Sequence, residues 1–267
     1  MLLKLFSKSY GICIITQIQN YTKKTKYQHF CIIFAFNIYT FINFVNKMKV
    51  LIVGSNSDIS RNLIESNNSI DFIELTSSAT LPDQNQVDIM DELTFPEIDQ
   101  PLDGFIYFPG SINLRPFSAL KDKDYQYDFN INVLGLVKTL KYYQKNLREN
   151  SSVIFISSVA AQIGMPYHAS ISICKSAIEG LTRSLAAEWA PKVRVNCIAP
   201  SLVNTKMSSR LLRTEKQIEQ INNRHPLKRY GNVKDISSAI EFLLSERSSW
   251  MTGQVLKIDG GISSLKI

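Results

Sequence analysis

The chain has 267 residues, of which 45% are hydrophobic and 20% charged, so it is long enough to bury a full core. Its formal net charge of +7 is unevenly placed, because residues 1–47 contain six Lys and no Asp, Glu or Arg. The rest of the chain is nearly neutral, which argues against a nucleic-acid-binding surface there.

Residues 1–47 differ from the rest of the chain in composition. Asn37, Thr40 and Asn43 interrupt their longest apolar stretch, whereas a membrane-spanning helix needs about 20 mostly apolar residues. No signal-peptide cleavage site stands out. We therefore predict that residues 1–47 are a disordered leader or a start-site artefact, with a membrane or targeting role as the alternative. Residues 48–267 are predicted to form the folded domain.

The cysteines give no sign of a disulfide framework or a metal site, because they lack paired spacing. A reducing cytoplasm is the expected location, and no metal is expected. The four residues are Cys13, Cys31, Cys174 and Cys197.

From Met48 onward, strand-like and helix-like patterns alternate along the chain. This alternation predicts an α/β fold with a single Rossmann-like, doubly wound parallel sheet flanked by helices. An inserted helical flap is predicted at 202–230. Strands are predicted at 49–53, 71–75, 86–89, 104–108, 152–156, 193–198 and 255–258, and helices at 61–66, 125–147, 170–189 and 235–244.

The turn after the first predicted strand is a candidate phosphate-binding loop. Gly54 allows a tight turn, the next helix offers free N–H groups, and Ser55 and Ser57 add polar donors. A simple strand-to-helix turn is the alternative. Asp88, placed at the end of the third predicted strand, is expected to accept a hydrogen bond from an adenine amino group.

A second candidate site lies between the predicted strand 152–156 and the helix that follows it. Ser158 stands just beyond the carboxyl end of that strand, where ligands bind in open parallel sheets. Lys175 lies on the helix, so the hydroxyl and the ammonium can converge on one small volume. Burying a lysine without a function would be unfavourable.

Several segments, in this order, resemble motifs of the short-chain dehydrogenase/reductase family. The resemblance extends from Met48 to about Gly261. The segments are VGSNSDIS at 53–60, LDGFIYFPG at 102–110, the Asn132–Gly135 NxxG pattern, Ile156–Ser158, Lys175 of YxxxK, RVNCIAPSLVNT at 194–205 and TGQVLKIDGG at 252–261.

The resemblance implies an NAD(P)-dependent oxidoreductase that acts on a small carbonyl or alcohol. It also implies a homodimer or homotetramer. Neither the acid typical of NAD binding nor an arginine typical of NADP binding follows the second strand, so the choice of cofactor stays open. The implied catalytic residues are Ser158, Lys175 and Asn132, and the implied cofactor-binding residues are Gly54, Ser55, Ser57, Asp58, Ile59, Asp88, Pro109, Gly110, Lys175 and Thr205.

The chain departs from the family pattern at the catalytic tyrosine, whose position falls on Ile171. Isoleucine has no proton to give, and losing a positioned acid typically removes about 10²–10⁴-fold in rate. Tyr167 and His168 lie just upstream, and we list Tyr167 as the candidate donor, with pocket lining as the alternative role. A catalytically reduced dinucleotide-binding sensor or partner subunit is the second hypothesis.

Overall fold

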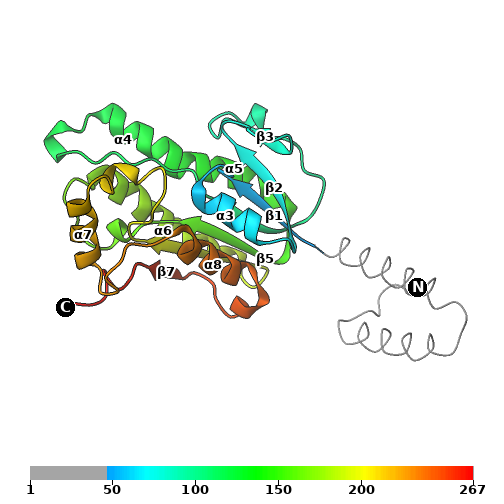
Figure 1. Ribbon diagram of the computed structural model, residues 1–267. Coiled ribbons are helices and arrows are strands. Elements are labelled where there is room, and N and C mark those ends of the chain that lie inside the picture. Colours follow the sequence, from blue (N-terminus) through cyan, green and yellow to red (C-terminus); the bar gives the residue numbers. More distant parts are fainter. Residues whose placement is uncertain (1–46, 267) are drawn as a thin grey trace, which may run out of the picture. The chain divides into compact units, whose positions relative to one another are not determined.

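A parallel sheet of seven strands runs through residues 47–266, the part of the chain that the computed structural model describes (Figure 1). The predicted leader at residues 1–47 lies outside this part, apart from Lys47. The strand order is β3-β2-β1-β4-β5-β6-β7. The strands are β1 (Met48–Val53), β2 (Ile70–Thr76), β3 (Gln84–Gln86), β4 (Leu102–Tyr107), β5 (Leu147–Ile156), β6 (Val193–Pro200) and β7 (Val255–Ile258).

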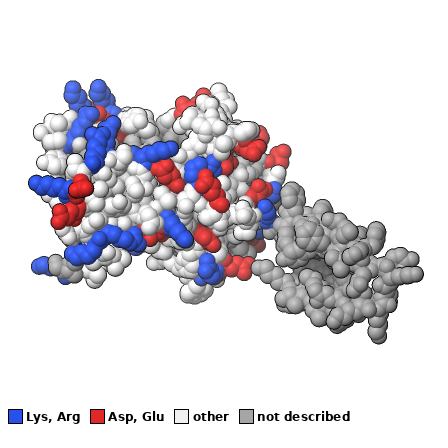
Figure 2. Space-filling view, viewed as in Figure 1, with Lys and Arg blue, Asp and Glu red and all other residues white. Residues whose placement is uncertain are grey.

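Helices cover both faces of the sheet, which confirms the predicted doubly wound architecture. Side chains alternate along β1: Val50 and Ile52 pack in the core with α3 (Asp58–Ser66) and α8 (Val233–Leu244). Leu51 and Val53 pack on the other face with α5 (Gly135–Tyr143) and α6 (Ala169–Trp189). This alternation is the two-residue period of a strand. Figure 2 shows charges of both signs scattered over the face that carries α3 and α8.

The strand order reverses direction at β1 and β4, and this position determines where a ligand can bind. From β1 the chain runs outward to β2 and β3, and it then returns to β4 on the other side of β1. In open α/β sheets such a switch point leaves a crevice at the carboxyl ends of the strands.

The single helix predicted over 125–147 is wrong, because the segment is divided. It consists of α4 (Asp122–Phe129), a π-helical turn at Asn130–Leu134, α5 and a short 3₁₀ turn, and β5 begins at Leu147. The Asn132 side-chain amide donates to the Asp128 carbonyl at 2.8 Å. That carbonyl is the regular helical acceptor for the backbone N–H of Asn132, so the competition accounts for the π turn.

The predicted third strand, 86–89, is also misplaced, since β3 spans Gln84–Gln86 and Asp88 lies beyond its end. Residues 77–83, which connect β2 to β3, form no helix. The Gln84 side chain holds this short connection, accepting from the backbone N–H groups of Thr80 at 2.8 Å and Leu81 at 3.3 Å. Within the predicted flap lie α7 (Glu215–Arg224) and a 3₁₀ turn at Ser209–Leu211.

Gly135 gives a stability prediction, because a Cβ there would lie 2.6 Å from Ile89 Cδ1 and 2.7 Å from Tyr107 Oη. We expect Gly135→Ala to lower the free energy of unfolding by about 1–3 kcal/mol through overpacking. The control is Gly180→Ala in α6, where an added Cβ meets nothing within 4 Å. It should raise stability by about 0.5–1 kcal/mol. Urea denaturation measures both, and equal effects would contradict the packing argument.

Candidate functional site

A cleft of about 930 Å³ lies at the carboxyl edge of the sheet, at the switch point between β1 and β4. Of the residues predicted to bind a cofactor, five line it: Gly54, Ser57, Asp88, Pro109 and Gly110. The other five do not line it: Ser55 is fully buried, Asp58 and Ile59 form the first turn of α3, Lys175 lies on α6, and Thr205 lies in the flap.

The turn at Gly54 brings the end of β1 close to the end of β4. Gly54 has φ +81°, and a Cβ there would lie 3.0 Å from Pro109 Cδ. Ser57 caps α3 by accepting from the Ser60 backbone N–H at 3.1 Å. The helix therefore begins at the wall of the cleft, with the free N–H groups and positive dipole end that favour a phosphate.

Beyond the end of β2 the cleft wall is polar but neutral. Thr76, Ser77 and Ser78 line it together with Asn56, whose side-chain amide donates to the Ser78 carbonyl at 2.5 Å. Among the described residues that line the cleft, Asp88 is the only charged one.

Lys175 extends from α6 towards Gly110, which lines the cleft, although Lys175 itself does not line it. Its ammonium donates to the Ile156 carbonyl at 2.9 Å, at the end of β5. A Cβ placed on Gly110 would lie 3.6 Å from Lys175 Nζ and 3.1 Å from Asn132 Oδ1. Both side chains therefore lie close to the Cα of Gly110. Burial lowers the pKa of Lys175 to about 8.

Asn132 presents an unsatisfied acceptor at this point. Its Oδ1 is buried and has no hydrogen-bond partner within residues 47–266, whereas Nδ2 donates to Ser111 Oγ and to the Asp128 carbonyl. Buried polar atoms are normally satisfied, so Oδ1 is suited to accept from a hydroxyl-bearing ligand or a water.

Ser158 lies just past β5, two residues beyond the carbonyl that holds Lys175. Its Oγ accepts from the Ala160 backbone N–H at 3.2 Å, which leaves the hydroxyl hydrogen to donate. The neighbouring Ser157 points elsewhere, donating to Glu179 Oε1 at 2.9 Å. Of this serine pair, Ser158 is therefore the one available to a ligand.

The position of the family's catalytic tyrosine, Ile171, and its two candidate replacements, Tyr167 and His168, lie around the start of α6 in different environments. Ile171 is buried on the helix, one turn before Lys175. Tyr167 precedes the helix with φ +68°, and 58% of it is exposed. His168 is the N-cap residue, and its Nδ1 lies 2.7 Å from the Pro166 carbonyl oxygen.

A buried polar cluster next to Asn132 was missed by the sequence analysis. The Asp128 carboxylate is fully buried, and it accepts hydrogen bonds from Ser111 at 2.5 Å and Ser170 at 2.6 Å. Its sequence signal is weak: Asp128 precedes Asn132 by four residues and so shares its helix face. The serines come from a loop and from another helix.

The sheet order and the cleft define a Rossmann-like α/β protein with a ligand site at the switch point. A family model described as enoyl-(acyl carrier protein) reductase matches residues 83–263, well over half of the chain. The chain belongs to the short-chain dehydrogenase/reductase family.

Relatives support this assignment over part of their length. A chloroplastic tropinone reductase homologue from Arabidopsis thaliana is 42% identical over 120 residues, which are 44% of this chain and 37% of that protein. The 3-oxoacyl-acyl-carrier-protein reductase FabG of Buchnera aphidicola is 34% identical over 156 residues, 57% of this chain and 63% of its own. The chain spans about half the length of the curated relatives it matches.

Solved structures share the fold across the whole described domain. The structure of ElxO with NADP bound superposes with a TM-score of 0.70 at 25% identity, covering 82% of this chain and all of ElxO. Within residues 47–266, none of the helices has the length and apolar character to cross a membrane.

The buried charge of Lys175 makes stability depend on pH. Its pKa falls from 10.5 to about 8 in the folded protein. The charge therefore opposes folding fully below pH 8, and this opposition fades as the pH rises towards 10.5. We expect Lys175→Met to raise the thermal midpoint at pH 7, to raise it less at pH 10, and to weaken nucleotide binding by about tenfold or more.

Calorimetry at pH 7 and pH 10 measures the thermal midpoints of Lys175→Met and the wild type. The difference in midpoint between the two proteins is then compared at the two pH values. Burial raises the pKa of Cys174 to about 11 and that of Cys197 to about 12, and the charge of Lys175 opposes both shifts. Lys175→Met should therefore raise these pKa values further, which lowers the variant's midpoint at pH 10 and acts in the same direction as the expected change. A lower midpoint for the variant at pH 7 would show that the bond to Ile156 outweighs the penalty of burial.

Proposed function

We propose that the chain is an NAD(P)-dependent oxidoreductase that acts on a small carbonyl or alcohol with a substituted proton donor. One observation carries the proposal: Lys175 Nζ and Asn132 Oδ1 would both lie within 4 Å of a Cβ on Gly110, which lines the cleft. Among residues 47–266 the ammonium has one acceptor, the Ile156 carbonyl, and it can donate further hydrogen bonds.

The residues of the cleft fit a dinucleotide. The Gly54 turn and the start of α3 would hold its phosphates, and Lys175 would hold the ribose on the nicotinamide side. Thr76, Ser77 and Ser78 would lie at the adenosine side. When bound, the cofactor supplies or accepts a hydride at the nicotinamide ring.

The chain's own residues would then position the substrate and move its proton. Ser158, which has a hydroxyl hydrogen to donate, would hold the substrate oxygen at the end of β5. Lys175 would keep the ribose and the substrate in register. Tyr167 remains a predicted donor, with a side chain that is 58% exposed.

A catalytically reduced dinucleotide-binding protein is the second candidate, and Ile171 favours it. The family's YxxxK pattern gives this position to tyrosine, and here a buried apolar side chain occupies it. Such a protein would bind the nucleotide through the same cleft and serve as a sensor or partner subunit.

The neutral wall beyond β2 predicts a preference for NAD(H). A 2′-phosphate would meet Ser77, Ser78 and Asn56 but no cation, because Arg61 is paired with Glu74 at 2.9 Å outside the cleft lining. We expect NAD(H) to bind about tenfold more tightly than NADP(H), the scale of one charge-assisted hydrogen bond. Ser77→Arg should shift the preference towards NADP(H).

Isothermal titration calorimetry with NAD⁺, NADH, NADP⁺ and NADPH tests both the proposed nucleotide binding and the preference for NAD(H). No binding of any of the four at millimolar concentration would refute the proposed function itself. Tighter binding of NADP(H) by the wild type would refute only the preference.

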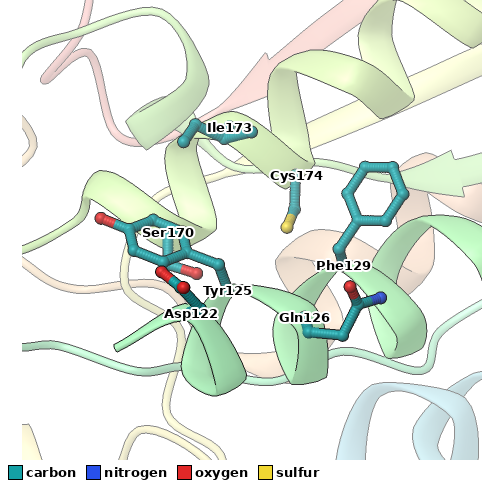
Figure 3. Close-up of a pocket in the computed structure, with 7 residues that line it drawn as sticks. All are labelled: Asp122, Tyr125, Gln126, Phe129, Ser170, Ile173 and Cys174. Atoms are coloured by element: carbon teal, nitrogen blue, oxygen red, sulfur yellow. The ribbon is translucent and has the colours of Figure 1, made fainter. Parts of the chain in front are cut away.

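We also propose that the protein forms a homodimer or homotetramer through α4 and α6. A groove between these helices, of about 340 Å³, has apolar walls that include Phe129, Ile173 and Cys174 (Figure 3). Ile173 is 56% exposed and adjoins the other apolar residues of the groove, so together they form a patch rather than a single exposed side chain.

Ile173→Glu tests this assembly. Placing a charge in the groove should shift the mass measured by light scattering at micromolar concentration towards the monomer. Leu93→Glu is the matched control, since Leu93 is 95% exposed in a 3₁₀ turn away from the groove. A wild-type protein that is already monomeric would rule the proposal out.

A reducing cytoplasm remains the proposed compartment. Cys174 and Cys197 are both buried free thiols, which is the usual state of cysteine in reducing surroundings.

A further inference from the structure

The lining of the cleft offers a dinucleotide little positive charge. Asp88 is the only charged residue among the described ones that line it, so the lining supplies no Lys or Arg. The start of α3 contributes the partial positive charge of a helix dipole, whereas both phosphates of a pyrophosphate are negative. A cation from outside the lining would therefore strengthen the phosphate site.

The flap brings one such cation, Lys206, to the phosphate turn. Its backbone N–H donates to Asp58 Oδ2 at 2.6 Å, and its ammonium lies 3.9 Å from Asp58 Oδ1. Asp58 is the first residue of α3 and follows Ser57, which lines the cleft. Met207, the residue after Lys206, lines the cleft as well. Both partners of the ion pair are thus next in the chain to residues of the cleft wall.

The ammonium end of this contact is weakly held. The Lys206 side chain is 91% exposed, and 3.9 Å is too long for a hydrogen bond. Within residues 47–266 the ammonium has no hydrogen-bond acceptor, and an exposed ion pair of this kind contributes little to stability. The backbone bond, by contrast, fixes the position of the residue. Lys206 is therefore held in place by its main chain, while its charge is free to move to a ligand.

We propose that Lys206 binds the pyrophosphate of the dinucleotide and that Asp58 is its positioning residue. This inference rests on the proposed binding of NAD(P) at the cleft and does not depend on the identity of the proton donor. The backbone bond to Asp58 keeps Lys206 beside the phosphate turn, and the ammonium exchanges its loose contact with the carboxylate for hydrogen bonds to phosphate oxygens. Charge-assisted hydrogen bonds to phosphate are stronger than an exposed ion pair, which favours the exchange.

Lys206→Met tests the contact, because it keeps the length of the side chain and the backbone N–H. We expect the Kd for NAD⁺ and that for ADP-ribose, measured by isothermal titration calorimetry, both to rise about tenfold. ADP-ribose lacks the nicotinamide but keeps the pyrophosphate, so equal losses locate the contact at the phosphates. Added NaCl should weaken NAD⁺ binding less in the variant than in the wild type, since one screened attraction is gone.

Lys216→Met is the matched control. Lys216 is an exposed lysine of α7 in the same flap. Its removal should change either Kd by less than about twofold, because its charge is not held at the phosphate turn. The thermal midpoints of both variants should stay close to that of the wild type, since both side chains are exposed.

Asp58→Asn separates phosphate binding from a purely structural link between the flap and α3. The amide oxygen can still accept from the Lys206 backbone N–H, while the negative charge is lost. We expect the Kd for NAD⁺ to fall about threefold, because no carboxylate then competes for the ammonium or repels the phosphates. If the pair served only to hold the flap, removing either charge would leave NAD⁺ binding unchanged or weaken it.

The inference would be overturned, with the proposed function intact, if the wild type binds NAD⁺ and Lys206→Met has no more effect than Lys216→Met. Unchanged or weaker binding by Asp58→Asn would overturn it as well, since the pair would then be structural. A loss confined to NADP⁺ would contradict it by placing the ammonium at the 2′-phosphate. Wild-type protein that binds none of the four nucleotides would instead refute the proposed function together with the inference that rests on it.

Discussion

An ammonium group inside a protein needs an acceptor, and the position of the buried Lys175 ammonium constrains much of the structure around it. The Ile156 carbonyl fixes the ammonium to the end of β5, and burial lowers its pKa to about 8. Gly110 leaves room for it, since a Cβ there would lie against both Lys175 and Asn132. The end of β5, the end of β4 and the middle of the α4–α5 segment are therefore constrained by one charge.

The π-helical turn at Asn130–Leu134 contains Asn132 and is associated with the orientation of its side chain. Asn132 gives its amide hydrogens to the Asp128 carbonyl and to Ser111, and its remaining oxygen has no hydrogen-bond partner within residues 47–266. A regular helix would use the Asp128 carbonyl for its own ladder, so the irregularity is the consequence of orienting this side chain. Irregular helical turns of this kind are frequent at functional sites.

Strand ends could be predicted from the sequence, whereas contacts between distant residues could not. Gly54, Ser158 and Lys175 follow recognisable strand and helix patterns, so periodicity places them at the carboxyl edge. Asp128 depends on Ser111 and Ser170, which are 17 and 42 residues away in the chain, and no local pattern pairs them. The misplacement of β3 has a similar cause, because the Gln84 side chain, rather than a crossover helix, holds the connection from β2.

The phosphate turn resembles the family's glycine-rich turn, but Asp58 and Ser60 stand where that pattern has its second and third glycines. Ser60, at one glycine position, donates to the Gly54 carbonyl at 3.0 Å and lies 2.6 Å from Ser57 Oγ, so side-chain bonds hold the turn. Asp58, at the other, would repel a phosphate if it faced the cleft. It accepts instead from the backbone N–H of Lys206 at 2.6 Å. Because Met207, the next residue, lines the cleft, this bond joins the flap to the phosphate turn, so the position of the flap and the shape of the phosphate site depend on each other.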